Sequence, residues 1–188
     1  MSIIIDGKEY EIDSDYYSLD SNNIETLPIE LFHFTDLVEL DLSYNYISVI
    51  PREIGLLVNL KVFVISFNRL LEIPKEIGNL VYLKELFFGH NQISEIPAEI
   101  GNLTELKELC VNHNKLTKIP IEICSLQRLD SLYLDENIIT VLPKELLGLP
   151  KLIDFNIFRN PLDPASELIA ESLREITRYR LDNPEGSD

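Results

Sequence analysis

The sequence predicts an α/β solenoid in which short repeated units stack side by side and form one continuous parallel β-sheet. Two columns of identical residues at a constant spacing predict this fold class, together with an alternation of apolar residues inside each unit. The chain has 188 residues, of which 45% are hydrophobic, so it is long enough to bury one sizeable core. We therefore expect one repeat domain with a cap at each end.

Asparagine recurs every 23 residues along the chain, without one insertion. Proline forms a second column, always six residues after an asparagine, and this column stops at Ser166. These columns predict six full units and a truncated seventh over residues 17–162. The two columns are Asn22, Asn45, Asn68, Asn91, Asn114, Asn137 and Asn160, and Pro28, Pro51, Pro74, Pro97, Pro120 and Pro143.

Each unit is expected to begin with a short strand. Apolar residues alternate there, as Leu40 and Leu42 do, so every second side chain enters the core and neighbouring units pair as parallel strands. The asparagine then lies in the turn after the strand. Its amide both donates to and accepts from backbone groups that the turn leaves unpaired inside the core.

The proline of each unit opens a Pro-x-Glu-Ile or Pro-x-Glu-Leu segment. Proline favours the start of a helix, and a glutamate two residues later lies near the positive end of the helical turn. We expect short helical turns on the convex side. One local role repeated six times explains the glutamates better than a cation site does. They are Glu30, Glu53, Glu76, Glu99, Glu122 and Glu145.

The two ends of the chain predict caps, because the first and last units have no neighbour to cover their leucines. Residues 1–16 predict a β-hairpin with a tight turn at Asp6-Gly7. Its apolar face would hold Ile3, Ile5, Tyr10 and Ile12.

Residues 163–181 predict a capping helix, with Asp163 as N-cap and Pro164 at the first helical position. Its apolar stripe would lie across the seventh strand, although the same stripe could instead bind a partner. The stripe contains Ala165, Ile169, Leu173 and Ile176. Residues 182–188 are expected to form a disordered tail.

These motifs resemble the leucine-rich repeat family over residues 17–162. The segment from Leu37 to Ile47 has three spaced leucines, then asparagine, then an aliphatic residue. The segments Ile73–Leu80 and Ile96–Leu103 resemble the intracellular Ras-group subclass and similar bacterial proteins. The resemblance implies a right-handed horseshoe whose concave parallel sheet binds other proteins, without naming the partner.

The departures of the sequence from the family pattern include four positions. Cys124 and Leu147 stand where other units have glycine, and Tyr17 and Phe63 stand where other strands have leucine. These substitutions are compatible with the fold. The chain carries no GTPase, kinase or ligase motif, so the effector domains of larger family members are not expected in it.

The formal net charge of −16 opposes binding to nucleic acid and to membranes. Residues 1–41 hold 11 acidic residues against one lysine, a net charge of −10. This acidic end is either a solubilising surface or a docking surface for a basic partner.

A cytoplasmic location is expected for this chain. Only two cysteines occur, Cys110 and Cys124, and they are expected to be reduced thiols. No basic segment precedes the first apolar residues, so a secretory signal is not expected. No apolar run approaches the roughly 20 residues of a membrane span.

The candidate partner-binding residues are the variable positions of the concave face, which form columns from strand to strand. Exposed apolar and aromatic residues in such columns mark an interaction site, with a charged rim at one end. The alternative is that these side chains only stabilise cross-strand pairs. The candidates are Tyr44, Tyr46, Val64, Phe67, Phe87, His90, Cys110, His113, Tyr133, Glu136 and Arg159.

The sequence thus predicts a non-enzymatic scaffold or adaptor in signal transduction, without a cofactor, that binds a protein or peptide. The alternatives are an inhibitor of a basic enzyme, a spacer that binds nothing, and a metal-dependent enzyme site at His90, His113 and Glu136. Parallel side chains on a sheet disfavour that metal site. Cys110 with His113 is a poor nucleophilic pair, because no oxyanion donor or closed pocket is evident. An exposed apolar face could also pair two copies of the chain.

Overall fold

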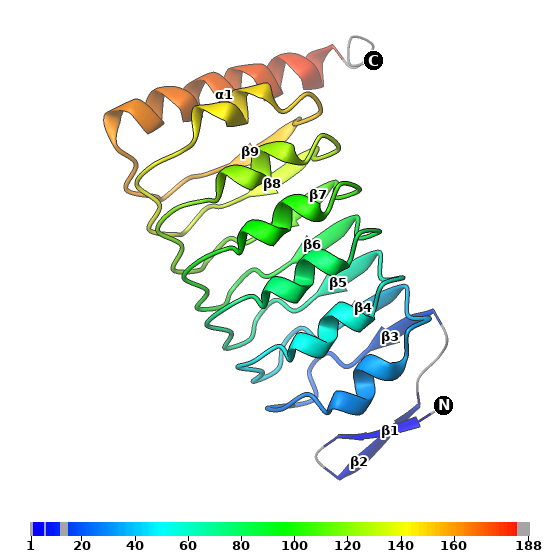
Figure 1. Cartoon of the computed structure of the whole chain (residues 1–188). Helices are drawn as coiled ribbons and strands as arrows, with labels where there is room; N and C mark the ends of the chain where they lie inside the picture. Colours follow the sequence, from blue (N-terminus) through cyan, green and yellow to red (C-terminus); the bar gives the residue numbers. More distant parts are fainter. Residues whose placement is uncertain (1, 6, 12–14, 184–188) are drawn as a thin grey trace.

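The computed structural model describes residues 2–5, 7–11 and 15–183, which form one elongated solenoid. A seven-stranded parallel sheet lines one side, and short 3₁₀ turns line the other (Figure 1). The strands follow one another in chain order, each aligned with the residues 23 positions further on. They are β3 (Tyr16–Ser18), β4 (Glu39–Asp41), β5 (Val62–Val64), β6 (Glu85–Phe87), β7 (Glu108–Cys110), β8 (Ser131–Tyr133) and β9 (Asp154–Asn156). The predicted solenoid with a parallel sheet is confirmed.

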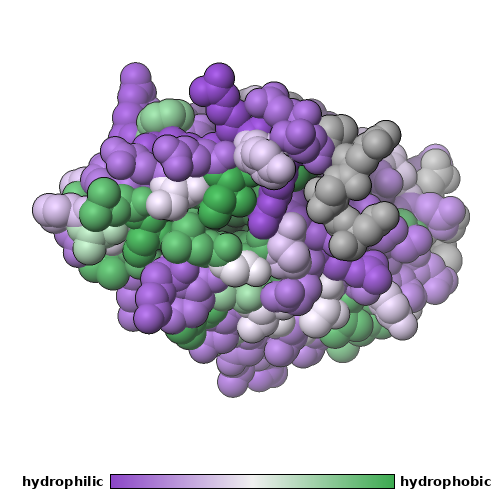
Figure 2. All heavy atoms as spheres, turned by 90° about the horizontal axis from the view of Figure 1, so that it is seen from above, coloured by the Kyte–Doolittle hydropathy of each residue, from purple (hydrophilic) through white to green (hydrophobic). Residues whose placement is uncertain are grey.

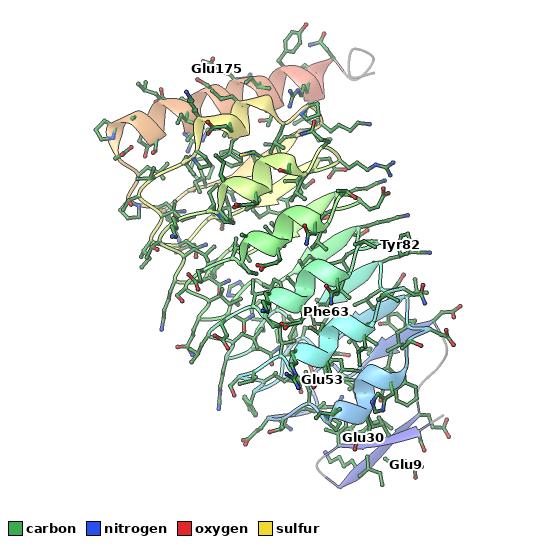
Figure 3. All side chains as sticks on the ribbon, viewed as in Figure 1. Glu9, Glu30, Glu53, Phe63, Tyr82 and Glu175 are labelled. Atoms are coloured by element: carbon green, nitrogen blue, oxygen red, sulfur yellow. The ribbon has the colours of Figure 1, made fainter. Side chains whose placement is uncertain are left out.

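The middle residue of every strand is buried, while the residues on either side of it face the open side of the sheet. Leu40 pairs with Phe63 in register, and both are fully excluded from solvent. Phe63 lies between the sheet and the turns, where its ring meets Phe88 edge to face at 6.0 Å (Figure 3). An aromatic residue therefore replaces leucine at this strand position without leaving the core.

The asparagine column is buried and links successive units. The Asn68 amide nitrogen donates to the backbone carbonyls of Leu42, Ile65 and Ser66. Its side-chain oxygen accepts from the backbone N–H of Ile47 at 2.9 Å. Each amide thus satisfies groups in its own unit and in the unit before it, as predicted. Asn22 differs because no unit precedes it, and it is half-buried.

The predicted helical turns of the convex side are 3₁₀ helices of five residues each. Each proline is the N-cap, with φ between −60° and −71°, and the glutamate lies in the first turn. A Cβ on Gly78 would lie 2.6 Å from the Glu99 carbonyl oxygen, so glycine permits close stacking of neighbouring turns. The turns are η1 (Ile29–His33), η2 (Arg52–Leu56), η3 (Lys75–Asn79), η4 (Ala98–Asn102), η5 (Ile121–Ser125) and η6 (Lys144–Gly148).

The N-terminal cap is an antiparallel hairpin of β1 (Ser2–Ile5) and β2 (Lys8–Glu11). Gly7 adopts a φ of +77°, which glycine tolerates and which the predicted tight turn requires. Ile3 and Ile5 are buried, while Tyr10 is half-buried and its hydroxyl donates to Asn22. Ile12, the fourth predicted member of the apolar face, lies outside the described residues.

The C-terminal cap is α1 (Pro164–Asp182), whose N-cap Asp163 accepts from the backbone N–H of Ser166 at 2.7 Å. The prediction that Ala165 belongs to the buried stripe is wrong, because Ala165 is exposed. The stripe runs through Ser166 instead, and its hydroxyl accepts from the buried backbone N–H of Leu142. Leu173 is buried as predicted, and Ile169 and Ile176 are half-buried.

Apolar residues are visible on the surface at the α1 end of the solenoid (Figure 2). Leu168, Leu181 and Phe158 are exposed there, and the Arg174 guanidinium covers the Phe158 ring at 4.8 Å. Within the described part of the chain, no helix has the length and apolar character that a membrane crossing requires. The predicted disordered tail falls mainly on residues 184–188, which lie outside the described residues.

Candidate binding face

The residue just before each asparagine has a left-handed backbone conformation, with φ between +51° and +58°. This conformation turns the chain out of the strand, and it costs residues other than glycine about 1–2 kcal/mol. Apart from the two histidines, none of the seven residues is of a type that adopts it readily, such as glycine, asparagine or aspartate. The residues are Ser21, Tyr44, Phe67, His90, His113, Glu136 and Arg159.

Four neighbouring members of this column form a continuous stack of rings, called the aromatic stack below. Tyr44 lies 4.3 Å from Phe67 between ring centroids, with 8° between the ring planes. Phe67 lies 4.0 Å from His90 at 11°, and His90 lies 4.0 Å from His113 at 14°. The sequence predicted these residues on one face, and the structure adds that their rings are parallel and in contact.

The aromatic stack lies at the surface. Tyr44 is 57% exposed and Phe67 is 38% exposed, whereas His90 and His113 are half-buried. The column continues beyond His113 with Glu136 and Arg159, which form an ion pair. The two residues predicted as a charged rim therefore lie at this end of the stack.

A second predicted column occupies the third position of the strands and runs parallel to the stack. Its members align in register, are half-buried and line the open face of the sheet. Its last member, Tyr133, donates its hydroxyl to Asp154 at 2.6 Å, which with burial raises its pKa to about 12. This tyrosine is thus held by a carboxylate, and it joins no ring stack within the part of the chain that the structure describes. The column contains Val64, Phe87, Cys110 and Tyr133.

Tyr46 lies just after the asparagine of its unit, beside the stack rather than within it. The guanidinium of Arg69 covers its ring, 4.3 Å from the centroid. Tyr46 remains 42% exposed. The predicted residue therefore belongs to the same side of the molecule, but the chain's own arginine already occupies one face of its ring.

A column of carboxylates on the first strand position was not predicted. Glu85 and Glu108 are aligned neighbours on β6 and β7, and both are half-buried. Burial raises the pKa of Glu108, and the nearby carboxylates, Glu85 foremost, raise it further. The sequence does contain a pattern that indicates this column, because several units have a glutamate or aspartate six residues before the asparagine. The column includes Glu39, Glu85, Glu108 and Asp154.

The proposed metal site at His90, His113 and Glu136 does not have a suitable geometry. Two imidazoles stacked at 4.0 Å hold their in-plane lone pairs parallel, whereas a metal needs them to converge at about 2.0–2.1 Å. The Glu136 carboxylate is engaged by Arg159. Among the described residues, no group of three potential ligands is arranged to hold a metal ion.

The thiol of Cys110 is poorly suited to nucleophilic chemistry. Burial raises its pKa to about 11, so at neutral pH it is the protonated thiol. The thiol also lies 3.2 Å from the side-chain oxygen of Asn112, to which it donates. Cys124 packs against the core from η5, and its pKa is raised to about 11 by burial as well.

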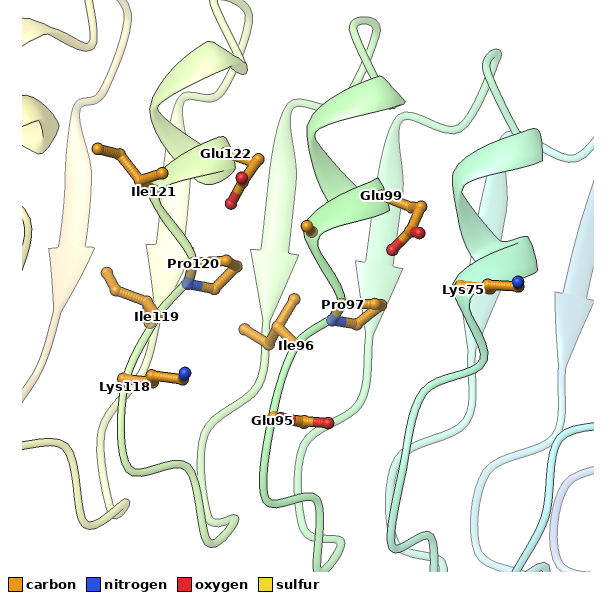
Figure 4. A pocket seen from close by; sticks show the side chains of 11 residues that line it. Lys75, Glu95, Ile96, Pro97, Glu99, Lys118, Ile119, Pro120, Ile121 and Glu122 are labelled. Atoms are coloured by element: carbon orange, nitrogen blue, oxygen red, sulfur yellow. The ribbon is translucent and has the colours of Figure 1, made fainter.

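A groove of about 590 Å³ lies on the convex side between the starts of η4 and η5 (Figure 4). Pro97 and Pro120 line it together with charged side chains of both signs, including Glu99 and Lys118. The repeat itself explains this groove, because adjacent turns leave space between their proline ends. The concave face, with its exposed rings, is the stronger candidate for binding.

Two family profiles match the chain. A leucine-rich repeat region matches residues 74–181, and a leucine rich repeat matches residues 18–70. None of the curated proteins matches the chain.

Several solved structures are similar to it. A leucine-rich repeat protein of Leptospira interrogans is 33% identical with a TM-score of 0.78, over 81% of this chain and 39% of that protein. The ectodomain of the Arabidopsis thaliana receptor kinase GASSHO1/SCHENGEN3, in complex with CASPARIAN STRIP INTEGRITY FACTOR 2, is 36% identical with a TM-score of 0.70. That match covers 76% of this chain and 18% of the ectodomain chain.

An internalin of Listeria monocytogenes shares the fold, with 24% identity and a TM-score of 0.64, over 81% of this chain and 50% of that one. The chain therefore spans half or less of the length of each of these three proteins.

Proposed function

Because the chain belongs to the leucine-rich repeat family, we propose that it is a non-enzymatic scaffold or adaptor that binds a protein or peptide across its concave face. The observation that carries this proposal is the aromatic stack. It presents aromatic rings to solvent from a rigid sheet, and aromatic residues contribute strongly to the centres of protein interfaces.

Energetics favour binding over a purely structural role for the stack. A stacked aromatic pair contributes about 0.5–1.5 kcal/mol, whereas each left-handed residue that is not glycine costs about 1–2 kcal/mol. Three ring pairs supported by four such residues therefore gain little net stability. Glycine or asparagine would adopt the left-handed backbone conformation at a lower cost in free energy. We therefore attribute the rings at these positions to binding and not to stabilisation of the fold.

The similar ectodomain was solved in complex with another factor, which agrees with a binding role for this repeat architecture. We also propose a cytoplasmic location and a role in signal transduction. The two cysteines are unpaired and lie on opposite sides of the solenoid, β7 and η5, as expected in a reducing compartment.

The second candidate function is inhibition of a basic enzyme through the acidic N-terminal end. The observation that favours it is the net charge of −10 over residues 1–41. Binding through this charge would weaken steeply as salt is added, whereas the ring contacts of the aromatic stack themselves would depend on salt only slightly.

The proposal is tested by retention of proteins from an extract of the cells that produce the chain. The wild type is compared with a concave variant, Tyr44→Ser, Phe67→Ser and Phe87→Ser. A matched control, Val58→Ser, Val81→Ser and Tyr82→Ser, removes three exposed apolar side chains elsewhere. Tyr82 lies at the edge where the turns lead into the strands (Figure 3). Circular dichroism first establishes that all three proteins are folded.

We expect a protein that the wild type and the control variant retain and the concave variant loses. The same protein must bind the purified wild type directly, which calorimetry measures. Equal retention by the concave variant would overturn the concave face as the binding surface. Loss of binding at raised salt with no effect of the concave variant would favour the acidic N-terminal end instead.

A further inference from the structure

The two ends of the aromatic stack differ. Beyond His113 the column continues with the Glu136–Arg159 ion pair, so charged side chains follow the last ring. Beyond Tyr44 it continues with Ser21, whose side chain is too small to cover a ring. Among the described residues, the one ring stacked on Tyr44 is that of Phe67, and Tyr44 is 57% exposed. The stack therefore ends with an uncovered ring face toward the first unit.

Two acidic residues are close in the chain to the two members of the column at this end, Ser21 and Tyr44. Asp20 is adjacent to Ser21 in the chain, and Asp41 is the last residue of β4. The Asp20 carboxylate accepts from the Ser18 hydroxyl, and that of Asp41 accepts from the Ser43 hydroxyl and backbone. Within residues 2–5, 7–11 and 15–183, neither carboxylate forms a salt bridge. Both negative charges are thus available to a cation from outside.

The molecule shows twice how a guanidinium uses an aromatic face. Arg69 covers Tyr46 at 4.3 Å, and Arg174 covers Phe158 at 4.8 Å. A guanidinium is planar, stacks on rings and pairs with carboxylates through several N–H donors, whereas an ammonium has no plane to stack. The open face of Tyr44 with two carboxylates nearby matches the first kind of cation better than the second.

We propose that the concave face binds a basic protein segment, and that an arginine of this segment extends the aromatic stack by lying on Tyr44 above Ser21. Asp20 and Asp41 would receive the N–H groups at the edges of the guanidinium. The inference rests on the proposed function, because it names the chemistry of the partner at that same face. Nucleic acid and anionic membranes are unsuitable occupants, since residues 1–41 carry a net charge of −10.

The test uses three defined probes on the intact chain, N-acetylarginine amide, N-acetyllysine amide and N-acetylcitrulline amide. Citrulline keeps the planar shape of arginine but has no charge. NMR follows the ring resonances of Tyr44 and, as an internal control, those of Tyr82 during each titration. We expect the arginine probe to shift the Tyr44 signals in a saturable way and to bind about two- to fivefold more tightly than the lysine probe. Citrulline should bind more weakly than arginine.

Two variants separate the contributions of ring and charge. Tyr44→Leu should remove the preference for arginine over lysine, while Tyr82→Leu should leave it unchanged. Asp20→Asn keeps the acceptor for the Ser18 hydroxyl and should weaken arginine binding without removing the preference. Thermal unfolding of each variant establishes that the fold is intact.

Equal shifts of Tyr44 with arginine and lysine, or an arginine preference that survives Tyr44→Leu, would overturn the proposal. Neither result would affect the retention experiment, because that experiment depends on the whole concave face and not on the chemistry of one contact. Conversely, an arginine preference at Tyr44 together with unchanged protein retention by the concave variant would contradict only the proposed function.

Discussion

Two columns of residues run along this solenoid one position apart, and they follow opposite rules. The asparagines of the five middle units are at most 9% exposed, and each holds the same set of backbone groups. The residues just before them share one backbone conformation but range from tyrosine to histidine, glutamate and arginine. The buried column is uniform because one hydrogen-bonding geometry recurs. The exposed column has no such requirement and can vary, and the proposed binding surface depends on its side chains.

The largest effect is expected from breaking the buried column at Asn91. Its side-chain oxygen accepts from the buried backbone N–H of Leu70 at 3.0 Å, and within the described part of the chain this group has no other acceptor. In Asn91→Ala this N–H loses its partner, and the amide's own donations are lost as well. We expect the free energy of unfolding to fall by about 2–4 kcal/mol, measured by urea denaturation.

Asn22→Ala is the matched control, because the same residue type there has no preceding unit and is half-exposed to water. Its amide donates to Asp20 and accepts from the Tyr10 hydroxyl. We expect a loss below about 1 kcal/mol. Equal losses for the two variants would contradict the explanation that burial of the backbone groups makes the asparagine column uniform.

An intermediate effect is expected from breaking the exposed column at Phe67, which stacks on both Tyr44 and His90. Phe67→Ala removes two ring contacts and should lower the free energy of unfolding by about 1–3 kcal/mol. Phe67→Gly removes the same contacts but relieves the left-handed backbone, so it should be about 0.5–1 kcal/mol more stable than the alanine variant. Urea denaturation of the two variants side by side measures this difference.

The comparison of alanine with glycine isolates the backbone from the ring. An alanine variant as stable as the wild type would show that stacking contributes nothing to the fold. A glycine variant less stable than the alanine variant would show that the left-handed conformation is not strained at this position. Either result would change the energetic argument for a binding role of the rings.

The fold could be predicted from the sequence because its determinants are local and repeat. Asn68 and Pro74 recur at fixed positions, so one unit suffices to assign strand, turn and 3₁₀ segment. The hairpin turn at Gly7 and the N-cap at Asp163 depend on residue types with strong backbone preferences. The assignment of Ala165 to the buried stripe was wrong because helical spacing alone does not reveal that the Ser166 hydroxyl satisfies the backbone of Leu142.

The candidate face could be predicted only in part. The spacing placed Phe67 and His90 on one face, but ring orientation depends on the backbone angle before the asparagine, which no residue type there signals. The hydrogen bond from Tyr133 to Asp154 joins residues 21 positions apart on different strands. The crowding of Glu85 and Glu108 likewise appears only once the strands are in register.

The smallest effect is expected from a change of pH. The asparagine column has no titratable side chain, whereas the exposed column contains histidines. Burial lowers the pKa of His90 below 6.5, and His113 lowers it further, while Asp135 and Glu136 oppose the shift. The other ring against His90 is the uncharged Phe67. The folded chain therefore resists protonation of His90 more than the unfolded chain does. The stability that comes from keeping this imidazole neutral is fully present above pH 6.5. It is lost as the pH falls through the lower pKa of the folded state.

We therefore expect the free energy of unfolding to fall between about pH 7.5 and pH 5.5, and to fall less in His90→Gln than in the wild type. The carboxylates common to both proteins cancel in this difference. An NMR titration of the imidazole measures the pKa of His90 directly. A pKa above 6.5 would mean that Asp135 and Glu136 outweigh burial and the second imidazole. The aromatic stack would then favour the protonated imidazole of His90. The contribution of His90 to the free energy of unfolding would rise as the pH falls, and the difference between the wild type and His90→Gln would have the opposite sign.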